Sequence, residues 1–180
     1  GNRWAHAGIG TQTAAIAATG YHSSIINTSE EYNGTSWTSG NNVSTNRYYL
    51  AAAGTQSAGL IMGGNTGSLS NVTEEYDGTN WSSGGNMNTA RYWLSNFGTQ
   101  TAGASCGGYA SGLSNVTEEY NGTGWTSSGN LNTARYNGAA AGTNHVVTLV
   151  TAASGTVLGT VSVGGGERII IKKDPSEVLY

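Results

Sequence analysis

Short apolar runs alternate along the chain with stretches of glycine, asparagine, serine and threonine. In one representative segment, residues 47–90, four such runs cover 47–53, 57–62, 71–76 and 80–83. They show no helical period and are bounded by turn-forming residues, which is typical of β-strands. The pattern therefore predicts an all-β unit of four short strands.

Dipeptides that favour tight turns separate the predicted strands. One such dipeptide lies between the third and fourth runs of each unit: Asn33-Gly34, Asp77-Gly78 and Asn121-Gly122. In two-residue hairpin turns both central residues need a positive φ, which Asn, Asp and Gly tolerate best. We therefore expect the third and fourth strands to form a hairpin closed by a two-residue turn. The sequence at residues 54–56 predicts a second turn, between the first and second strands.

The four-strand unit repeats with a period of 44 residues. Three residue types recur at this step: Arg3, Arg47, Arg91 and Arg135; Tyr32, Tyr76 and Tyr120; Trp37, Trp81 and Trp125. Counted from each arginine, the units run 3–46, 47–90 and 91–134, and a fourth begins at residue 135. A fixed period of this length is the signature of a repeat architecture. We expect three full units and the start of a fourth within residues 1–144.

The repeat resembles a known family through elements that occur in a fixed order. These are a double glycine, a Glu-x-Tyr, a tryptophan, an apolar residue and an arginine: Gly63-Gly64, Glu74, Tyr76, Trp81, Met87 and Arg91. The series is similar to the kelch signature, and the resemblance covers residues 3 to about 144. It implies four-stranded β-propeller blades. Near-identical repeats rich in Asn, Thr and Gly are also similar to those of bacteriophage virion proteins, including tail and capsid fibres.

A different pattern follows the repeats. Runs rich in β-branched residues at 145–151, 156–163 and 167–171 predict a β-strand segment that spans 145–180. Propellers typically contain about four to eight blades, so three units do not close a ring. Either the C-terminal segment supplies a last blade, or copies associate, or the repeats stack openly. We expect a homo-oligomer.

Composition and charge exclude several classes of function. Only 9% of the residues are charged and the net charge is -3, with no run of Lys or Arg, so we expect no nucleic-acid binding. The apolar runs are too short to span a bilayer, so we expect no membrane insertion. Cys106 is the single cysteine, which excludes an internal disulfide and indicates a small core side chain. The chain starts without methionine, as expected of a processed product or a section of a longer polypeptide.

The few charges recur with the repeat, which indicates a structural use. Each unit keeps one arginine and two adjacent glutamates, and alternate residues of a strand point to opposite faces. The hypothesis is that one glutamate per unit forms a partly buried ion pair with an arginine at the start of a unit. The residues predicted to form these pairs are Glu30, Glu74, Glu118, Arg47, Arg91 and Arg135.

Catalysis has little support in the sequence. Paired carboxylates serve as acid and base in glycoside hydrolysis, but neighbours such as Glu74 and Glu75 face opposite sides of a strand and do not converge on one bond. The histidines His6, His22 and His145 lack both repeat partners and metal-ligand spacing. The sequence therefore predicts a protein that is not an enzyme and needs no metal or cofactor.

The aromatic residues fall into two groups. Trp37, Trp81 and Trp125 each follow a tight turn once per unit, which is more typical of a packing anchor than of a sugar platform. The aromatic residues of the variable segments are the better candidates for ligand contact: Trp4, Tyr21, Trp93 and Tyr109.

These observations favour a binding or structural role. We expect a virion protein, a phage fibre or decoration component, that presents loops on rigid blades to other virion proteins or to a host surface glycan or receptor. The alternative is a secreted bacterial adhesin or carbohydrate-binding propeller. Both place the protein in a virion or outside the cell.

Overall fold

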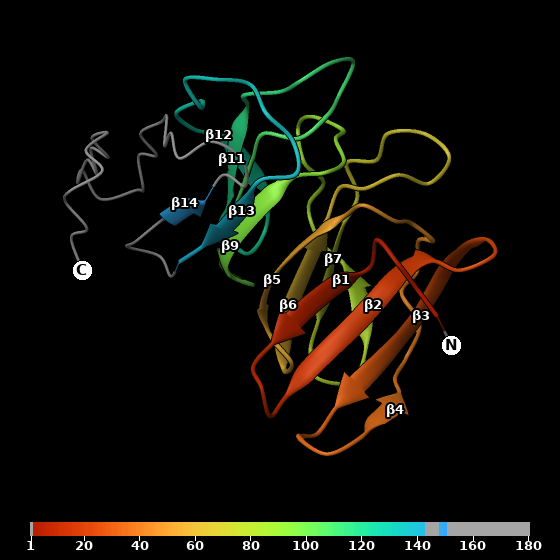
Figure 1. The fold of residues 1–180 in the computed structure, drawn as a ribbon. Helices are drawn as coiled ribbons and strands as arrows, with labels where there is room; N and C mark the ends of the chain where they lie inside the picture. The colour runs from red at the N-terminus through yellow and green to blue at the C-terminus, as the bar shows by residue number, and fades with distance from the viewer. Residues whose placement is uncertain (1, 143–147, 151–180) are drawn as a thin grey trace, which may run out of the picture.

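The computed structural model describes residues 2–142 and 148–150, and the described part is all-β. It contains three four-stranded antiparallel sheets, each formed by one repeat unit and each with its strands in chain order (Figure 1). Unit one contributes β1 Ala7–Gly10, β2 Ala15–Tyr21, β3 Ile25–Tyr32 and β4 Trp37–Ser39. Unit two contributes β5 Ala51–Thr55, β6 Ala58–Met62, β7 Thr73–Tyr76 and β8 Trp81–Ser83. Unit three contributes β9 Ser95–Thr99, β10 Ala102–Cys106, β11 Thr117–Tyr120 and β12 Trp125–Ser127. The predicted fold class is confirmed.

A fourth, smaller sheet follows unit three. β13 (Ala139–Ala141) pairs antiparallel with β14 (Thr148–Val150). β14 lies within the strand predicted at 145–151. The strands predicted at 156–163 and 167–171 lie outside the described residues.

The first strand of each unit begins later than the sequence pattern predicted. In unit two it starts at Ala51 rather than at residue 47, and it continues to Thr55 into the segment assigned to a turn. The cause is Tyr49, whose φ of 55° is in the left-handed region and therefore interrupts an extended strand. A short segment between the arginine and the strand is consequently free to form its own contacts.

The predicted two-residue hairpin turn is also wrong. In unit two the register pairs Tyr76 with Trp81, so the loop spans the four residues 77–80, and only Gly78 has a positive φ. The Asp77 carboxylate accepts hydrogen bonds from the backbone N–H groups of Thr79 at 2.8 Å and Asn80 at 2.6 Å. This side-chain cap holds a longer turn without requiring a second positive φ.

The sheets lie face to face, with their first strands side by side. β1 contacts β5, β5 contacts β9, and β9 contacts β13. Each sheet therefore has two distinct faces. We call the face that packs on the preceding unit the incoming face, and the face that packs on the following unit the outgoing face.

The core lies between consecutive sheets. Between units one and two, Ile16 and Val43 of the outgoing face pack with Tyr76 and Trp81 of the incoming face. The same interface recurs between units two and three, where Leu60, Met62 and Met87 pack with Tyr120 and Trp125. Trp81 and Trp125 are only 9% and 7% exposed and are packing anchors, as the sequence predicted, whereas Trp37, predicted to do the same, is 50% exposed. Cys106 is fully buried in the next cluster, with Phe97, Ala104 and Leu131.

Polar contacts fix the same interfaces. Gln56 of unit two donates to the carbonyl oxygens of Ala15 and Tyr32 of unit one, at 3.1 and 2.9 Å. Gln100 of unit three makes the same contact with unit two, donating to the carbonyl oxygens of Gly59 and Tyr76. Because the partners are backbone atoms, the contact tolerates changes in the side chains of the accepting unit.

Candidate functional site

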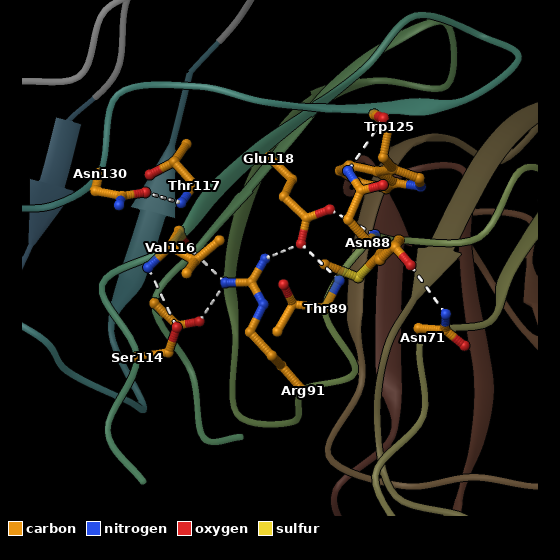
Figure 2. Close-up of polar contacts among 12 residues, drawn as sticks. Asn71, Asn88, Thr89, Arg91, Ser114, Val116, Thr117, Glu118, Trp125 and Asn130 are labelled. Atoms are coloured by element: carbon orange, nitrogen blue, oxygen red, sulfur yellow. Dashed lines mark hydrogen bonds and ion pairs between the residues drawn. The ribbon is translucent and has the colours of Figure 1, made fainter. Parts of the chain in front are cut away.

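The glutamate and arginine predicted to pair are brought together in the buried core of units two and three. In unit three, Arg91 Nη2 lies 3.0 Å from Glu118 Oε1, and neither side chain is exposed (Figure 2). The Nη1 of Arg91 donates to the carbonyl oxygens of Gly107 and Val116, at 2.6 and 2.7 Å. The guanidinium group therefore ties the first strand region to the second and third strands of its own sheet.

The carboxylate of Glu118 also reaches the preceding unit. It accepts hydrogen bonds from the backbone N–H groups of Asn88 at 2.6 Å and Thr89 at 3.2 Å (Figure 2). Each pair thus does two things: it orders one sheet internally, and it holds the loop of the sheet before it.

Unit two repeats this arrangement. Arg47 Nη2 lies 3.1 Å from Glu74 Oε1, with side chains 0% and 1% exposed, and Glu74 accepts from Ser44 N and Thr45 N of unit one. Burial lowers the pKa of Arg47 to about 10, while the charge of Glu74 acts in the opposite direction. Desolvation is thus the larger influence on this guanidinium, as is common for buried ion pairs.

The remaining predicted members lie in different surroundings. Glu30 pairs with Arg3 at 2.8 Å, but its side chain is 36% exposed. The Nε of Arg135 donates to the carbonyl oxygen of Thr133 at 3.2 Å. Both residues lie at the ends of the three-sheet array.

The second glutamate of each pair has a structural partner as well. Glu31 accepts a hydrogen bond from the hydroxyl of Tyr76, and Glu75 accepts one from the hydroxyl of Tyr120 at 2.5 Å. Neighbouring glutamates therefore serve opposite faces of the sheet, as strand alternation predicts.

The four aromatic residues predicted to contact ligand lie in one continuous row. Trp4 packs on Tyr21 with ring centroids 5.0 Å apart, and Tyr109 packs on Tyr92 at 5.4 Å. The row runs across all three units and into the fourth. We call it the aromatic belt; its members are Trp4, Tyr21, Tyr48, Tyr49, Tyr92, Trp93, Tyr109 and Tyr136.

A chain of backbone hydrogen bonds positions the belt. Tyr49 N donates to the carbonyl oxygen of Ala5 at 2.9 Å, Trp93 N to that of Tyr49 at 3.0 Å, and Asn137 N to that of Trp93 at 3.1 Å. These four equivalent residues have φ values between 54° and 56°. A left-handed backbone costs an ordinary residue about 1–2 kcal/mol, and such outliers concentrate at functional sites. The bulky Tyr49 and Trp93 are held there by their neighbours.

The belt is partly accessible to solvent. Trp4 and Tyr136 at its two ends are 49% and 45% exposed, and the six rings between them are half-buried. Burial, and after it the neighbouring tyrosines, raise the pKa of the Tyr92 hydroxyl. The belt therefore presents partly exposed aromatic rings and phenol groups, which suit stacking and hydrogen bonding with a polar, uncharged ligand.

Half of the belt was missed from the sequence. Four of its eight members are predicted from the sequence, and Tyr48, Tyr49, Tyr92 and Tyr136 are the other four. Trp4, Tyr48, Tyr92 and Tyr136 are in fact equivalent positions, one after each arginine. The signal was present as a recurring aromatic class, and it was obscured because the residue type changes from Trp to Tyr.

The part of the chain that the structure describes contains neither the geometry of a metal site nor a membrane-spanning helix. Residues 2–142 and 148–150 contain no group of three or more His, Cys, Asp or Glu side chains arranged to hold a metal ion. Within the same residues there is no helix of the length and apolar character needed to cross a membrane.

Comparisons with known proteins give no family assignment. No model of a known protein family matches the chain, and no curated protein matches it.

Proposed function

We propose that the protein is a non-enzymatic binding protein that uses the aromatic belt to contact a glycan on a cell surface. The observation that carries the proposal is the continuous row of eight partly exposed rings on one rim of the repeat array. Flat aromatic faces pack on the apolar faces of sugar rings, while tyrosine hydroxyls offer hydrogen bonds. The rigid, hydrogen-bonded backbone below the rings reduces the entropy lost on binding.

The absence of a catalytic role is part of the same proposal. Glu74 and Glu118 are buried and bonded to an arginine and to two backbone N–H groups each. Glu31 and Glu75 are engaged by tyrosine hydroxyls. These carboxylates serve the fold, which supports a binding rather than a hydrolytic function.

We further infer that the units are kelch-type propeller blades. Gly63 and Gly64 both have a positive φ, and a Cβ on Gly63 would lie 2.6 Å from the carbonyl oxygen of Arg91. A side chain at Gly63 would therefore be crowded where the following unit approaches, and the positive φ of both residues favours glycine. In unit one Thr19 takes the place of the first glycine, with a φ of 59°. The side-by-side first strands support the same blade arrangement.

The biological setting we propose is a virion, in which the protein is a fibre or decoration component that binds a host receptor. The support is the similarity of its near-identical Asn/Thr/Gly-rich repeats to phage fibre repeats. A secreted bacterial adhesin is the second candidate, and the belt supports both. Mass spectrometry of purified particles distinguishes them, because only a virion component co-purifies with capsids or tails.

Binding itself is tested with a matched pair of tryptophan variants. Trp4 in the belt and Trp37 outside it are 49% and 50% exposed, so Trp4→Ala and Trp37→Ala remove rings of equal exposure. On a glycan microarray we expect the native chain and Trp37→Ala to bind the same glycans. Trp4→Ala should bind about tenfold more weakly, which corresponds to about 1.4 kcal/mol. Equal binding by both variants, or no glycan bound by the native chain, would contradict the proposal.

A further inference from the structure

Among the described residues, no sheet packs on the incoming face of unit one, although the equivalent faces of units two and three are buried. Trp37 is 50% exposed, whereas its equivalents Trp81 and Trp125 are 9% and 7% exposed. Gln12 is likewise exposed, while its equivalents Gln56 and Gln100 each donate to two carbonyl oxygens of the preceding unit. Unit one therefore carries the residues of a whole inter-sheet interface, with no partner for it in residues 2–142 and 148–150.

Two polar groups on this face also lack the partners that the repeat provides elsewhere. Glu74 and Glu118 each accept hydrogen bonds from two backbone N–H groups of the unit before them, whereas the carboxylate of Glu30 accepts its described hydrogen bond from Arg3. The hydroxyls of Tyr76 and Tyr120 donate to Glu31 and Glu75 of the preceding unit. Among the described residues, the equivalent hydroxyl of Tyr32 has no such acceptor.

The uncovered face already has the geometry of a formed interface. The rings of Tyr32 and Trp37 lie 5.1 Å apart at 34°, compared with 4.8 Å and 38° for the buried pair Tyr76 and Trp81. The Arg3–Glu30 pair is formed at 2.8 Å, and a groove beside it is lined by Ile26 and other residues. The face is thus pre-organised, so binding a partner costs little side-chain ordering.

The repeat specifies what fits there. Where the interface is complete, the partner presents two adjacent backbone N–H groups, as at Ser44 and Thr45, and a carboxylate for the incoming phenol. We propose that the incoming face of unit one binds the outgoing face of another 44-residue repeat of the same type as units one and two. This proposal does not depend on the glycan function.

Unit three of a second copy does not meet this specification. Its Ser128 places a side chain where units one and two have glycine, and this side chain lies against the carboxylate that would receive the phenol, donating to Glu119 at 2.7 Å. The equivalent residue of unit two is Gly84, where an added Cβ would lie 2.8 Å from the hydroxyl oxygen of Tyr120. The occupant is therefore a repeat that keeps glycine at this position, as at Gly40 and Gly84.

The experiment adds such a repeat to the native chain. A copy of residues 47–90 is joined directly before Arg3, which keeps the 44-residue period, and hydroxyl-radical footprinting with mass spectrometry reports the oxidation rate of Trp37. If the copy docks, we expect that rate to fall roughly five- to sevenfold, in proportion to the exposures of Trp37, Trp81 and Trp125. A matched extended chain that carries Gly84→Ser in the added copy alone should retain most of the Trp37 oxidation.

Every outcome bears on the proposal. A folded copy that leaves Trp37 as reactive as before would overturn it. A copy that remains protease-sensitive would do so as well, because a repeat docked on a formed neighbour gains the interface energy that stabilises it. The native chain is measured in parallel over a range of concentrations. If Trp37 becomes protected there as the chain multimerises, the occupant is unit three of a second copy and the assignment fails.

Discussion

The buried ion pairs allow a quantitative test of what holds the repeats together. In the variant Glu74→Gln, one oxygen of the side chain still accepts from its neighbours, but an amide N–H₂ replaces the other. In the native protein the carboxylate of Glu74 accepts from three donors: Arg47 Nη2 at 3.1 Å, Ser44 N at 2.8 Å and Thr45 N at 3.2 Å. The variant leaves the buried charge of Arg47 without a counter-charge, and the new amide N–H₂ group faces one of these N–H donors without an acceptor between them.

The expected cost follows from the burial of the pair. Removing one partner of a buried ion pair destabilises by about 3–5 kcal/mol. The matched control is Glu30→Gln, because Glu30 makes the same pair with Arg3 at a side-chain exposure of 36% and holds no preceding loop among the described residues. Exposed pairs contribute about 0–1 kcal/mol.

Urea unfolding followed by circular dichroism compares the two variants. With a slope of about 2 kcal/mol per molar urea, Glu74→Gln should lower the midpoint by about 1.5–2.5 M, and Glu30→Gln by less than about 0.5 M. The reasoning is wrong if both variants shift the midpoint by the same amount. The double variant Arg47→Met/Glu74→Gln should remain destabilised, because Arg47 Nη1 also serves the carbonyls of Gly63 and Val72.

Two further predictions follow from buried titratable groups. Burial, and then the hydrogen bond to Glu75, raise the pKa of Tyr120 to about 12. The unfolded tyrosine loses its proton near pH 10, whereas the folded one keeps it. The free energy of unfolding should therefore fall as the pH rises from about 10 to 12. Melting temperatures across this range should decline less steeply for Tyr120→Phe, and identical slopes would contradict the assignment. Burial also raises the pKa of Cys106 to about 11, so a disulfide reagent at pH 8 should label this thiol only after denaturant is added. Rapid labelling of the folded chain would show that the thiol is accessible.

Much of the fold could be predicted from the sequence because Arg, Glu, Tyr and Trp recur with a fixed 44-residue period. They recur because every inter-sheet interface pairs the same polar groups and packs the same aromatic rings, whereas the aliphatic core residues vary from unit to unit. The ends of the strands were less predictable. Tyr49 interrupts the predicted strand through a left-handed backbone that no residue preference signals, and the Asp77 carboxylate supports a four-residue turn in place of the two-residue turn.

The candidate site was only half predictable for a related reason. Its members share an aromatic character but not a residue type, so a search for identical residues separates Trp4 from Tyr48. Their convergence also depends on the contact between the segments that precede neighbouring first strands, for example of Ala5 with Tyr49, which joins positions 44 residues apart. The difference between the exposed Trp37 and the buried Trp81 required the structure as well, because both have the same local sequence setting.

The variation among repeats suggests a way to separate folding from recognition. Position 49 is equivalent to Ala5, Trp93 and Asn137, and all four have the same left-handed backbone. Asparagine tolerates that conformation better than tyrosine, so Tyr49→Asn should leave the free energy of unfolding within about 1 kcal/mol of the native value, since the lost ring packing is offset by backbone relief. The same change removes the ring that touches both Trp4 and Trp93, at 5.6 and 4.9 Å, and so breaks the aromatic belt in its middle. Glycan binding should therefore fall by tenfold or more while the urea midpoint hardly moves. If the midpoint falls steeply and binding survives, the belt is a packing device, and the ligand is contacted elsewhere.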